Sequence, residues 1–273
     1  MKWYFALSEA SIDRADHDWR NLVLTAVKSA RRNTDLRPNL IYDGQESEFT
    51  QALRLLGVTI IPHRISFYDV LADYGQRLIA DGKNSDWYLR IASGCFLRID
   101  IPLIEKEDEY VLYTDCDVLF LRNPSVSTIR PRFFAVAPEG QIDDYADMNS
   151  GVMVINIEGM RKTYLDFKDC IAKNIEYGLD QELLRLFYSG WYDKLSHQLN
   201  WKPYWGVSQK SEIVHWHGPK PIAIDRMLTG GEPAKIQIFN DLLARSPNGY
   251  EHYLRLWKRE LEADISDHSS SDK

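Results

Sequence analysis

Two aspartates, Asp115 and Asp117, directly follow an apolar, β-favouring run that begins at Tyr110. In an extended chain, side chains two residues apart point to the same side, so the two carboxylates are expected to lie together. Such carboxylates repel each other unless a cation lies between them. A divalent metal relieves this repulsion and can also hold a diphosphate. The pattern therefore predicts a metal site that handles a nucleotide-linked substrate.

The same triplet has a structural alternative, because Asp-x-Asp sequences also cap helices and line turns. The strand before Asp115 favours the functional interpretation, since open α/β sheets bind ligands at the carboxyl ends of their strands. Cys116 lies between the two acids, and alternation points it away from them. We interpret its thiol as a packing group, not as a nucleophile.

A second polar cluster follows another predicted strand, from Ile213 to His215. An imidazole could complete a carboxylate site for a borderline cation such as Mn²⁺, and His217 offers the same chemistry as His215. Gly218 would let the backbone approach a phosphate, and Lys220 could neutralise a diphosphate oxygen. The alternative is a surface loop with a solvated histidine and lysine.

Polar residues between these clusters are candidates for sugar binding. Asn149 precedes Ser150, Gly151 and an apolar strand, and could either bind a sugar hydroxyl or form the turn into that strand. Asp180 and Gln181 begin a predicted helix that ends near Tyr188. Asp180 could equally serve as the helix N-cap.

Composition narrows the class of protein. The chain has 273 residues, 44% hydrophobic content and a formal net charge of −7, which predicts one large α/β domain and argues against a nucleic-acid partner. The three cysteines have no metal-like spacing and indicate a reducing compartment. No segment has the length of a membrane span or of a signal-peptide core, so we expect a cytoplasmic protein.

Strands and helices alternate along the chain, which predicts a mostly parallel sheet covered by helices on both faces. The predicted strands are Trp3–Leu7, Pro38–Tyr42, Val58–Ile61, Tyr110–Thr114, Phe133–Ala137, Val152–Asn156 and Ile213–His215. Apolar residues at helical spacing predict helices from Trp19 to Ala30, Phe49 to Leu56, Trp87 to Cys95, and Met160 to Ile171. The segment from Tyr188 to Pro233 is rich in Trp, Tyr, Pro and Gly and is interpreted as loops over a ligand.

The predicted organisation is a single catalytic domain over residues 1–245, followed by an amphipathic helix and a polar tail over residues 246–273. The apolar side of that helix includes Tyr250, Tyr253, Leu254, Trp257 and Leu261. We favour docking of this side on the domain. Contact with a partner or with the inner face of the membrane is the alternative.

These segments together resemble the family 8 glycosyltransferases, which are retaining enzymes of the GT-A fold and include bacterial galactosyl- and glucosyltransferases. The resemblance spans residues 1–222, and the order and spacing of its landmarks are more specific than any one of them. The landmarks in chain order are Arg90, Tyr113–Asp117, Asn123–Pro124, Asn149–Gly151, Asp180–Gln181, Asn200–Trp201 and His215–Lys220.

The resemblance implies transfer of galactose or glucose from a UDP-sugar to a saccharide or lipid-linked glycan, as in surface polysaccharide assembly. Asp115, Asp117 and His215 would ligate Mn²⁺, with Mg²⁺ as the alternative ion and His217 as the alternative ligand. Gln181 would lie beside the anomeric carbon, with Asp180 and Arg90 as the other catalytic candidates. The residues implied in binding the donor are Ala6, Ser8, Asp43, Arg90, Asp115, Asn149, Gly151, Asp180, Gly218 and Lys220.

The sequence departs from the family pattern in two places. A single residue, Pro219, separates Gly218 from Lys220 where two are common, so we expect the lysine to meet a different phosphate oxygen. The segment from Ala6 to Ser11 lacks the acid and the asparagine that often contact uridine there.

Two other hypotheses compete with glycosyl transfer. A haloacid-dehalogenase-like phosphotransferase would use Asp115 as its nucleophile and Asp143–Asp144 as a later acid pair, but its motif normally opens the core domain. A non-catalytic sugar-binding module would stack aromatic rings on a sugar. Its candidate rings are Trp201, Tyr204, Trp205 and Trp216.

Overall fold

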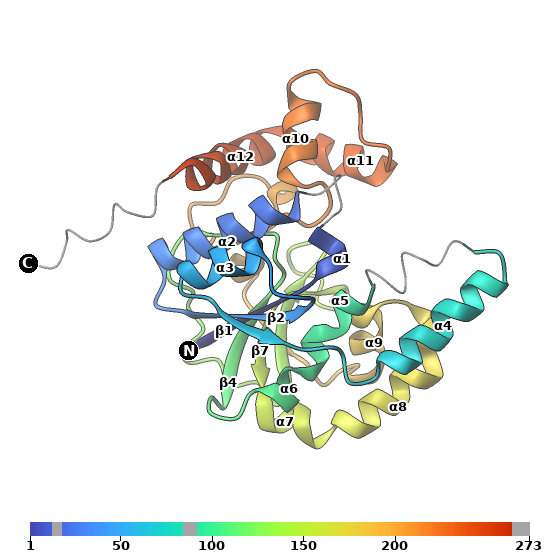
Figure 1. Ribbon diagram of the computed structural model, residues 1–273. Coiled ribbons are helices and arrows are strands. Elements are labelled where there is room, and N and C mark those ends of the chain that lie inside the picture. Colours follow the sequence, from blue (N-terminus) through green and yellow to red (C-terminus); the bar gives the residue numbers. More distant parts are fainter. Residues whose placement is uncertain (13–17, 84–91, 264–273) are drawn as a thin grey trace, which may run out of the picture.

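The computed structural model describes residues 1–12, 18–83 and 92–263 (Figure 1). Within these residues, seven strands form one sheet in the order β3-β2-β1-β4-β7-β6-β8, and β5 pairs with β9 in a second sheet. The strands are β1 (Lys2–Ser8), β2 (Arg37–Asp43), β3 (Thr59–Pro62), β4 (Tyr110–Thr114), β5 (Val118–Phe120), β6 (Phe134–Pro138), β7 (Met148–Asn156), β8 (Asp193–Lys194) and β9 (Ile213–His215).

Parallel pairing dominates the large sheet. β1 is parallel to β2 and to β4, β2 is parallel to β3, and β6 is parallel to β8. β7 runs antiparallel to both of its neighbours, β4 and β6. The mostly parallel, helix-flanked sheet predicted from the sequence is confirmed, and it places the carboxyl ends of β1, β2 and β4 at one edge.

Helices flank both faces of the large sheet (Figure 1). The longer ones are α2 (Trp19–Asn33), α3 (Glu48–Leu55), α4 (Tyr68–Ala80), α7 (Ile157–Lys162), α8 (Tyr164–Asn174), α9 (Asp180–Phe187), α10 (Pro221–Leu228), α11 (Gln237–Arg245) and α12 (Pro247–Glu262). The shorter turns are α1 (Glu9–Ile12), α5 (Ser93–Phe96), η2 (Leu97–Asp100), α6 (Ile101–Ile104), η3 (Ile175–Tyr177), η4 (His197–Asn200) and η5 (Pro203–Trp205).

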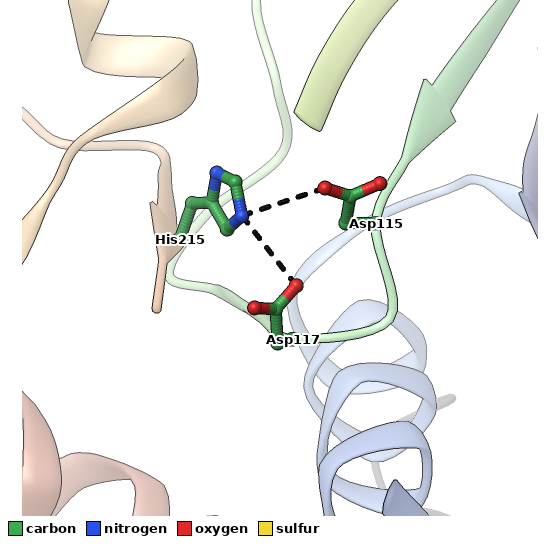
Figure 2. A group of neighbouring side chains, drawn as sticks. All are labelled: Asp115, Asp117 and His215. Carbon is green, nitrogen blue, oxygen red and sulfur yellow. Dashed lines mark ion pairs between the residues drawn. The ribbon is translucent and has the colours of Figure 1, made fainter. Parts of the chain in front are cut away.

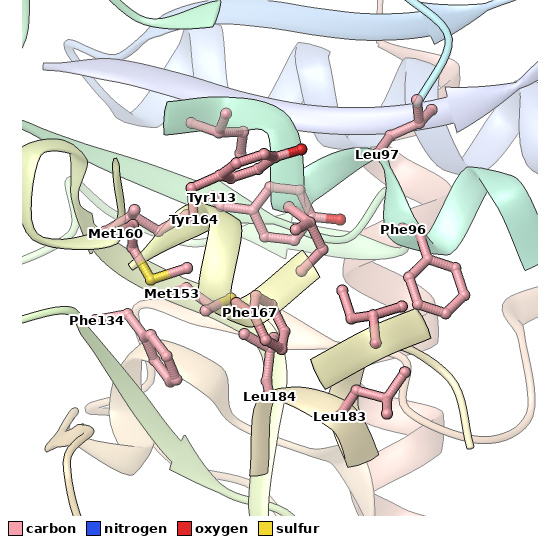
Figure 3. Packing of buried hydrophobic residues seen from close by; sticks show 14 of the residues in the cluster. Phe96, Leu97, Tyr113, Phe134, Met153, Met160, Tyr164, Phe167, Leu183 and Leu184 are labelled. Atoms are coloured by element: carbon pink, nitrogen blue, oxygen red, sulfur yellow. The ribbon is translucent and has the colours of Figure 1, made fainter. Parts of the chain in front are cut away.

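Alternation along β1 divides the core between the two faces of the sheet. Tyr4 joins a cluster that includes Phe96 and Phe167 and packs beneath the helices from α4 to α9 (Figure 3). Trp3 and Phe5 join the opposite cluster, against α2 and α3. Both faces are therefore buried, as expected for a sheet that is mostly parallel.

The C-terminal helix α12 packs against α2, α10 and η5. Its apolar side, with Tyr250, Tyr253, Leu254 and Trp257, is buried in a third cluster. Because this side is covered by protein, the structure does not support membrane contact through the helix. No helix in the described part of the chain is both long enough and apolar enough to span a membrane.

Several elements differ from their sequence-based predictions. The helix predicted from Met160 to Ile171 is divided at Thr163 into α7 and α8. The short strands β5 and β8 were not predicted, and the segment from Tyr188 to Pro233 contains η4, η5 and α10 in addition to loops and the predicted strand β9. Trp87 lies outside the described residues, so the helix predicted there is described only where Cys95 falls in α5.

Candidate active site

Asp115, Asp117 and His215 come together beyond the carboxyl end of β4 (Figure 2). β5 begins directly after Asp117 and pairs with β9, which sets Val118 opposite His215. His215 Nε2 lies 3.6 Å from Asp115 Oδ2 and 3.4 Å from Asp117 Oδ1. A short strand pair therefore brings a histidine almost 100 residues away in sequence to the acid pair.

A chain of hydrogen bonds fixes which nitrogen of His215 faces the carboxylates. The Gly151 backbone N–H donates to Asn149 Oδ1 at 3.1 Å, and Asn200 Nδ2 donates to the same oxygen at 2.8 Å. Asn200 Oδ1 must then accept from His215 Nδ1, at 3.0 Å. In the neutral ring the lone pair consequently lies on Nε2, directed toward the acids, as in histidines that bind metals.

Gly151 is needed for this arrangement. A Cβ atom at this position would lie 2.2 Å from His215 Cε1 and 2.9 Å from Asn149 Oδ1. The backbone of Gly151 also accepts a hydrogen bond from the Asp115 N–H at 2.8 Å. One glycine thus leaves room for the imidazole and links β7 to the first acid.

The donor set fits a divalent cation. The candidate ligand atoms of Asp115, Asp117 and His215 all lie within 4.8 Å of one another. Two ligand atoms that each lie about 2.1 Å from one ion are about 3 Å apart when they subtend a right angle at it. The separations of 3.4 and 3.6 Å are somewhat longer, and small side-chain shifts would close the difference. Two carboxylates and one imidazole suit Mn²⁺, and the carboxylates also suit Mg²⁺.

Lys220 lies against the second acid. Its Nζ is 2.5 Å from Asp117 Oδ2 and also donates to the Trp216 carbonyl at 2.8 Å. Burial of Asp117 acts to raise the pKa of its carboxyl, but Lys220 and His215 outweigh burial and hold that pKa well below its usual range. Gly218 has a φ of +94°, and a Cβ there would lie 2.6 Å from Leu242. The turn that returns Lys220 to Asp117 therefore favours glycine.

Arg98 connects the metal candidates with the sugar-binding candidates, and the sequence analysis missed it. The guanidinium lies 2.8 Å from Asp115 Oδ1 and 2.9 Å from Asp180 Oδ2. It also donates to the Ser150 carbonyl at 2.7 Å and lies over the Tyr113 ring. Arg98 lies between Leu97 and Ile99 in an apolar run, which indicates that its side chain is buried. Because a buried arginine requires acidic partners, this position could have identified it as a candidate site residue.

Asp180 and Gln181 lie at the start of α9. Burial raises the pKa of Asp180 to about 6, and the nearby Arg98 opposes that rise. Gln181 Oε1 accepts from the Ser150 N–H at 2.9 Å and from Asn149 Nδ2 at 3.2 Å. The structure therefore gathers Asn149, Asp180 and Gln181 beside the acid pair.

A cleft of about 430 Å³ opens at the carboxyl ends of β1, β2 and β3. Ser8 and Asp43 line it and are register partners at the ends of β1 and β2. Asp43 lies 3.4 Å from Arg64, another lining residue. Ala6 lies further back on β1 and does not line the cleft. Its carbonyl accepts a hydrogen bond from the Cys116 thiol.

His217, the alternative metal ligand, is placed differently from His215. His217 Nε2 faces Glu139 at 3.6 Å, and its Nδ1 lies 3.4 Å from the Tyr204 hydroxyl. Burial, together with His215 and Lys202, holds the pKa of His217 well below its usual value. His217 is not part of the Asp115 cluster, and Arg90 lies outside the described residues.

The fold is similar to those of solved glycosyltransferase structures. No protein-family model matches the sequence, and no curated protein matches it in sequence. Among solved structures, galactosyltransferase LgtC, in complex with donor and acceptor sugar analogues, matches with a TM-score of 0.61 and 17% identity over 89% of this chain and 95% of LgtC. The chain has the GT-A glycosyltransferase fold.

Two further GT-A structures support this assignment. Glycosyltransferase GlyE from Streptococcus pneumoniae TIGR4 matches with a TM-score of 0.59 and 18% identity over 95% of this chain. The match spans 63% of the GlyE chain, less than two thirds of its length. Mouse xyloside xylosyltransferase 1 matches with a TM-score of 0.53 and 17% identity, over 79% of this chain and 97% of that one.

The GT-A fold and the burial of the aromatic rings bear on the two competing hypotheses. The fold argues against a haloacid-dehalogenase-like phosphotransferase. Trp201, Tyr204 and Trp216 are 6%, 4% and 0% exposed, so these rings belong to the core and are not available to stack on a sugar. Trp205, the fourth candidate ring, is partly exposed, so burial argues against sugar stacking for three of the four rings.

Proposed function

We propose that this protein is a retaining glycosyltransferase that transfers a hexose, galactose or glucose, from a UDP-sugar to a hydroxyl of a saccharide or lipid-linked glycan. The observation that carries the proposal is the convergence of Asp115, Asp117 and His215 at the carboxyl edge of a GT-A sheet. When bound there, Mn²⁺ neutralises the diphosphate and stabilises the charge that develops on it as the sugar leaves.

Lys220 provides the second positive charge for the diphosphate. In this structure the Lys220 ammonium group neutralises Asp117, and the lysine side chain is 13% exposed. Once Asp117 ligates a cation, the lysine is free to pair with a phosphate oxygen. Lys220 therefore stabilises Asp117 when no substrate is bound, and it stabilises the diphosphate leaving group when the donor is bound.

The nucleoside is assigned to the cleft lined by Ser8 and Asp43. Asp43 can accept hydrogen bonds from ribose hydroxyls, and Ser8 can donate or accept. The cleft lies at the ends of β1 and β2, next to β4, whose end carries the acid pair. A nucleoside in the cleft therefore extends its diphosphate toward Asp115 and Asp117.

The transferred sugar is assigned to the side of the site where Asn149, Asp180 and Gln181 gather. Asp180 has the hydrogen-bonding groups needed for sugar hydroxyls. The Asn149 amide is already bonded to Gly151, Asn200 and Gln181, so Asn149 is assigned to this side by its place beside Gln181. Attack by the acceptor hydroxyl from the side of the leaving group gives retention, with the departing phosphate oxygen accepting the proton. Gln181, an amide and a poor nucleophile, is assigned to the opposite face of the sugar, and we propose no covalent intermediate on it.

The test is UDP release from a panel of UDP-sugars, measured with Mn²⁺ and with EDTA. We expect release from UDP-galactose or UDP-glucose that EDTA abolishes and added Mn²⁺ restores, and a faster rate when a saccharide acceptor is present. NMR of the product should give the same anomeric configuration as the donor. Absence of release from every sugar, with and without acceptors, would argue against glycosyl transfer.

A further inference from the structure

The side-chain amide of Gln181 is held at both ends. Its Nε2 donates to Glu139 Oε2 at 2.5 Å, and its Oε1 accepts from the Ser150 backbone N–H at 2.9 Å. A backbone N–H can only donate, and an ionised carboxylate can only accept. The two contacts therefore permit a single orientation of the amide, with its oxygen toward Ser150 and its nitrogen toward Glu139.

The backbone that carries Glu139 is fixed by a segment more than 60 residues away in sequence. Three consecutive carbonyls, those of residues 138, 139 and 140, each accept a hydrogen bond from a side chain. Their donors are Lys202 Nζ at 2.6 Å, the Tyr204 hydroxyl at 2.5 Å and Trp205 Nε1 at 3.1 Å. The Glu139 N–H in turn donates to the Asp147 carbonyl at 2.7 Å.

We propose that Glu139 is a positioning residue for glycosyl transfer, which sets the orientation of the Gln181 amide and places a negative charge beside it. This inference rests on the proposed function. Because Oε1 of Gln181 is engaged by Ser150 and Asn149, the amide oxygen is not directed toward an open space. The Glu139 carboxylate, which also accepts from Asn149 Nδ2 at 3.4 Å, therefore places negative charge next to Gln181 when positive charge develops on the sugar.

Variants of Glu139 separate this role from a structural one. Glu139→Ala is expected to lower kcat for UDP release about 10- to 100-fold, because Gln181 loses its fixed orientation. The affinity for UDP with Mn²⁺ should change by less than about 3-fold, since the diphosphate is assigned to the acid pair, and KM for the donor should change less than kcat. Glu139→Gln keeps an oxygen acceptor for Nε2 and should recover part of kcat. Asp143→Asn, which changes an exposed carboxylate in the following loop, is the matched control.

A charge exchange tests the contact without any transfer reaction. Gln181→Glu places two carboxylates at the 2.5 Å contact and should lower Tm by about 3–8 °C at pH 8. Adding Glu139→Gln restores an amide–carboxylate pair with the amide now at position 139 and the carboxylate at position 181. The double variant should recover at least about half of the lost Tm.

The outcomes distinguish the two proposals. A Gln181→Glu variant with unchanged Tm, or a double variant with no recovery, would overturn the positioning contact even if the enzyme is active. Unchanged kcat in Glu139→Ala would overturn the role in turnover. A clear recovery in the double variant with no UDP release from wild-type protein would overturn the proposed function, and with it the role of Glu139 in transfer.

Discussion

Replacing Asp117 with asparagine is expected to lower Mn²⁺-dependent UDP release about 100- to 1,000-fold. The asparagine keeps the shape of the side chain but loses the charge that faces both His215 Nε2, at 3.4 Å, and Lys220 Nζ, at 2.5 Å. The cation then loses one of its two carboxylate ligands. The measurement is kcat at saturating donor and Mn²⁺, followed by a Mn²⁺ titration, in which the half-saturating concentration should rise.

Two companion variants make this result interpretable. Asp117→Asn removes the carboxylate that pairs with Lys220, so the variant changes more than the metal site. His215→Gln keeps the Asp117–Lys220 pair and should also lower Mn²⁺-dependent UDP release. Asp73→Asn changes an exposed carboxylate on α4 and should leave activity unchanged. Wild-type activity with an unaltered Mn²⁺ requirement in both Asp117→Asn and His215→Gln would contradict the metal assignment.

Replacing Arg98 with methionine is expected to lower the free energy of unfolding by about 3–5 kcal/mol. The guanidinium is buried and forms ion pairs with Asp115 and Asp180, and the Asp180 side chain is only 5% exposed. Methionine leaves the Asp180 carboxylate buried without a cation. Urea denaturation at pH 7.5 measures the loss.

The second step is a double-mutant cycle. Asp180→Asn in the Arg98→Met background removes the uncompensated charge and should recover part of the lost stability, so that the two changes are not additive. Arg98→Lys keeps the charge but cannot donate in two directions from a planar group, and an intermediate stability is expected. An Arg98→Met variant as stable as wild type would show that the ion pairs do not stabilise the fold.

The sequence is informative where the pattern is local. An apolar run followed by Asp115 and Asp117 predicts a strand with acids at its carboxyl end, because strand periodicity and burial depend on neighbouring residues. The structure places β4 there, and β1 and β2 also lie within one residue of their predicted ranges. His215 could be associated with the acids only through the order of landmarks, since the β5–β9 pairing that joins them spans almost 100 residues.

The features of the site and the fold that could not be predicted depend on contacts between residues far apart in the sequence. The buried Arg98 forms an ion pair with Asp180 in the folded protein. Nothing in the sequence near either residue indicates that the two are partners. Glu139 follows β6 as an ordinary polar residue, and its contact with Gln181, 42 residues later, is seen only in the folded chain. The reversed direction of β7 is likewise a matter of topology, because an apolar strand has the same pattern in either direction.

Equilibrium binding of UDP, measured by calorimetry with Mn²⁺ and with EDTA, tests the central claim most directly because it requires neither the correct sugar nor the correct acceptor. We predict that UDP binds at least about 10-fold more tightly with Mn²⁺, since Asp115, Asp117 and His215 would hold a cation that neutralises the diphosphate. His215→Gln should remove most of that difference. Equal affinity with Mn²⁺ and with EDTA, or no binding of UDP, would contradict a metal-dependent UDP-sugar site.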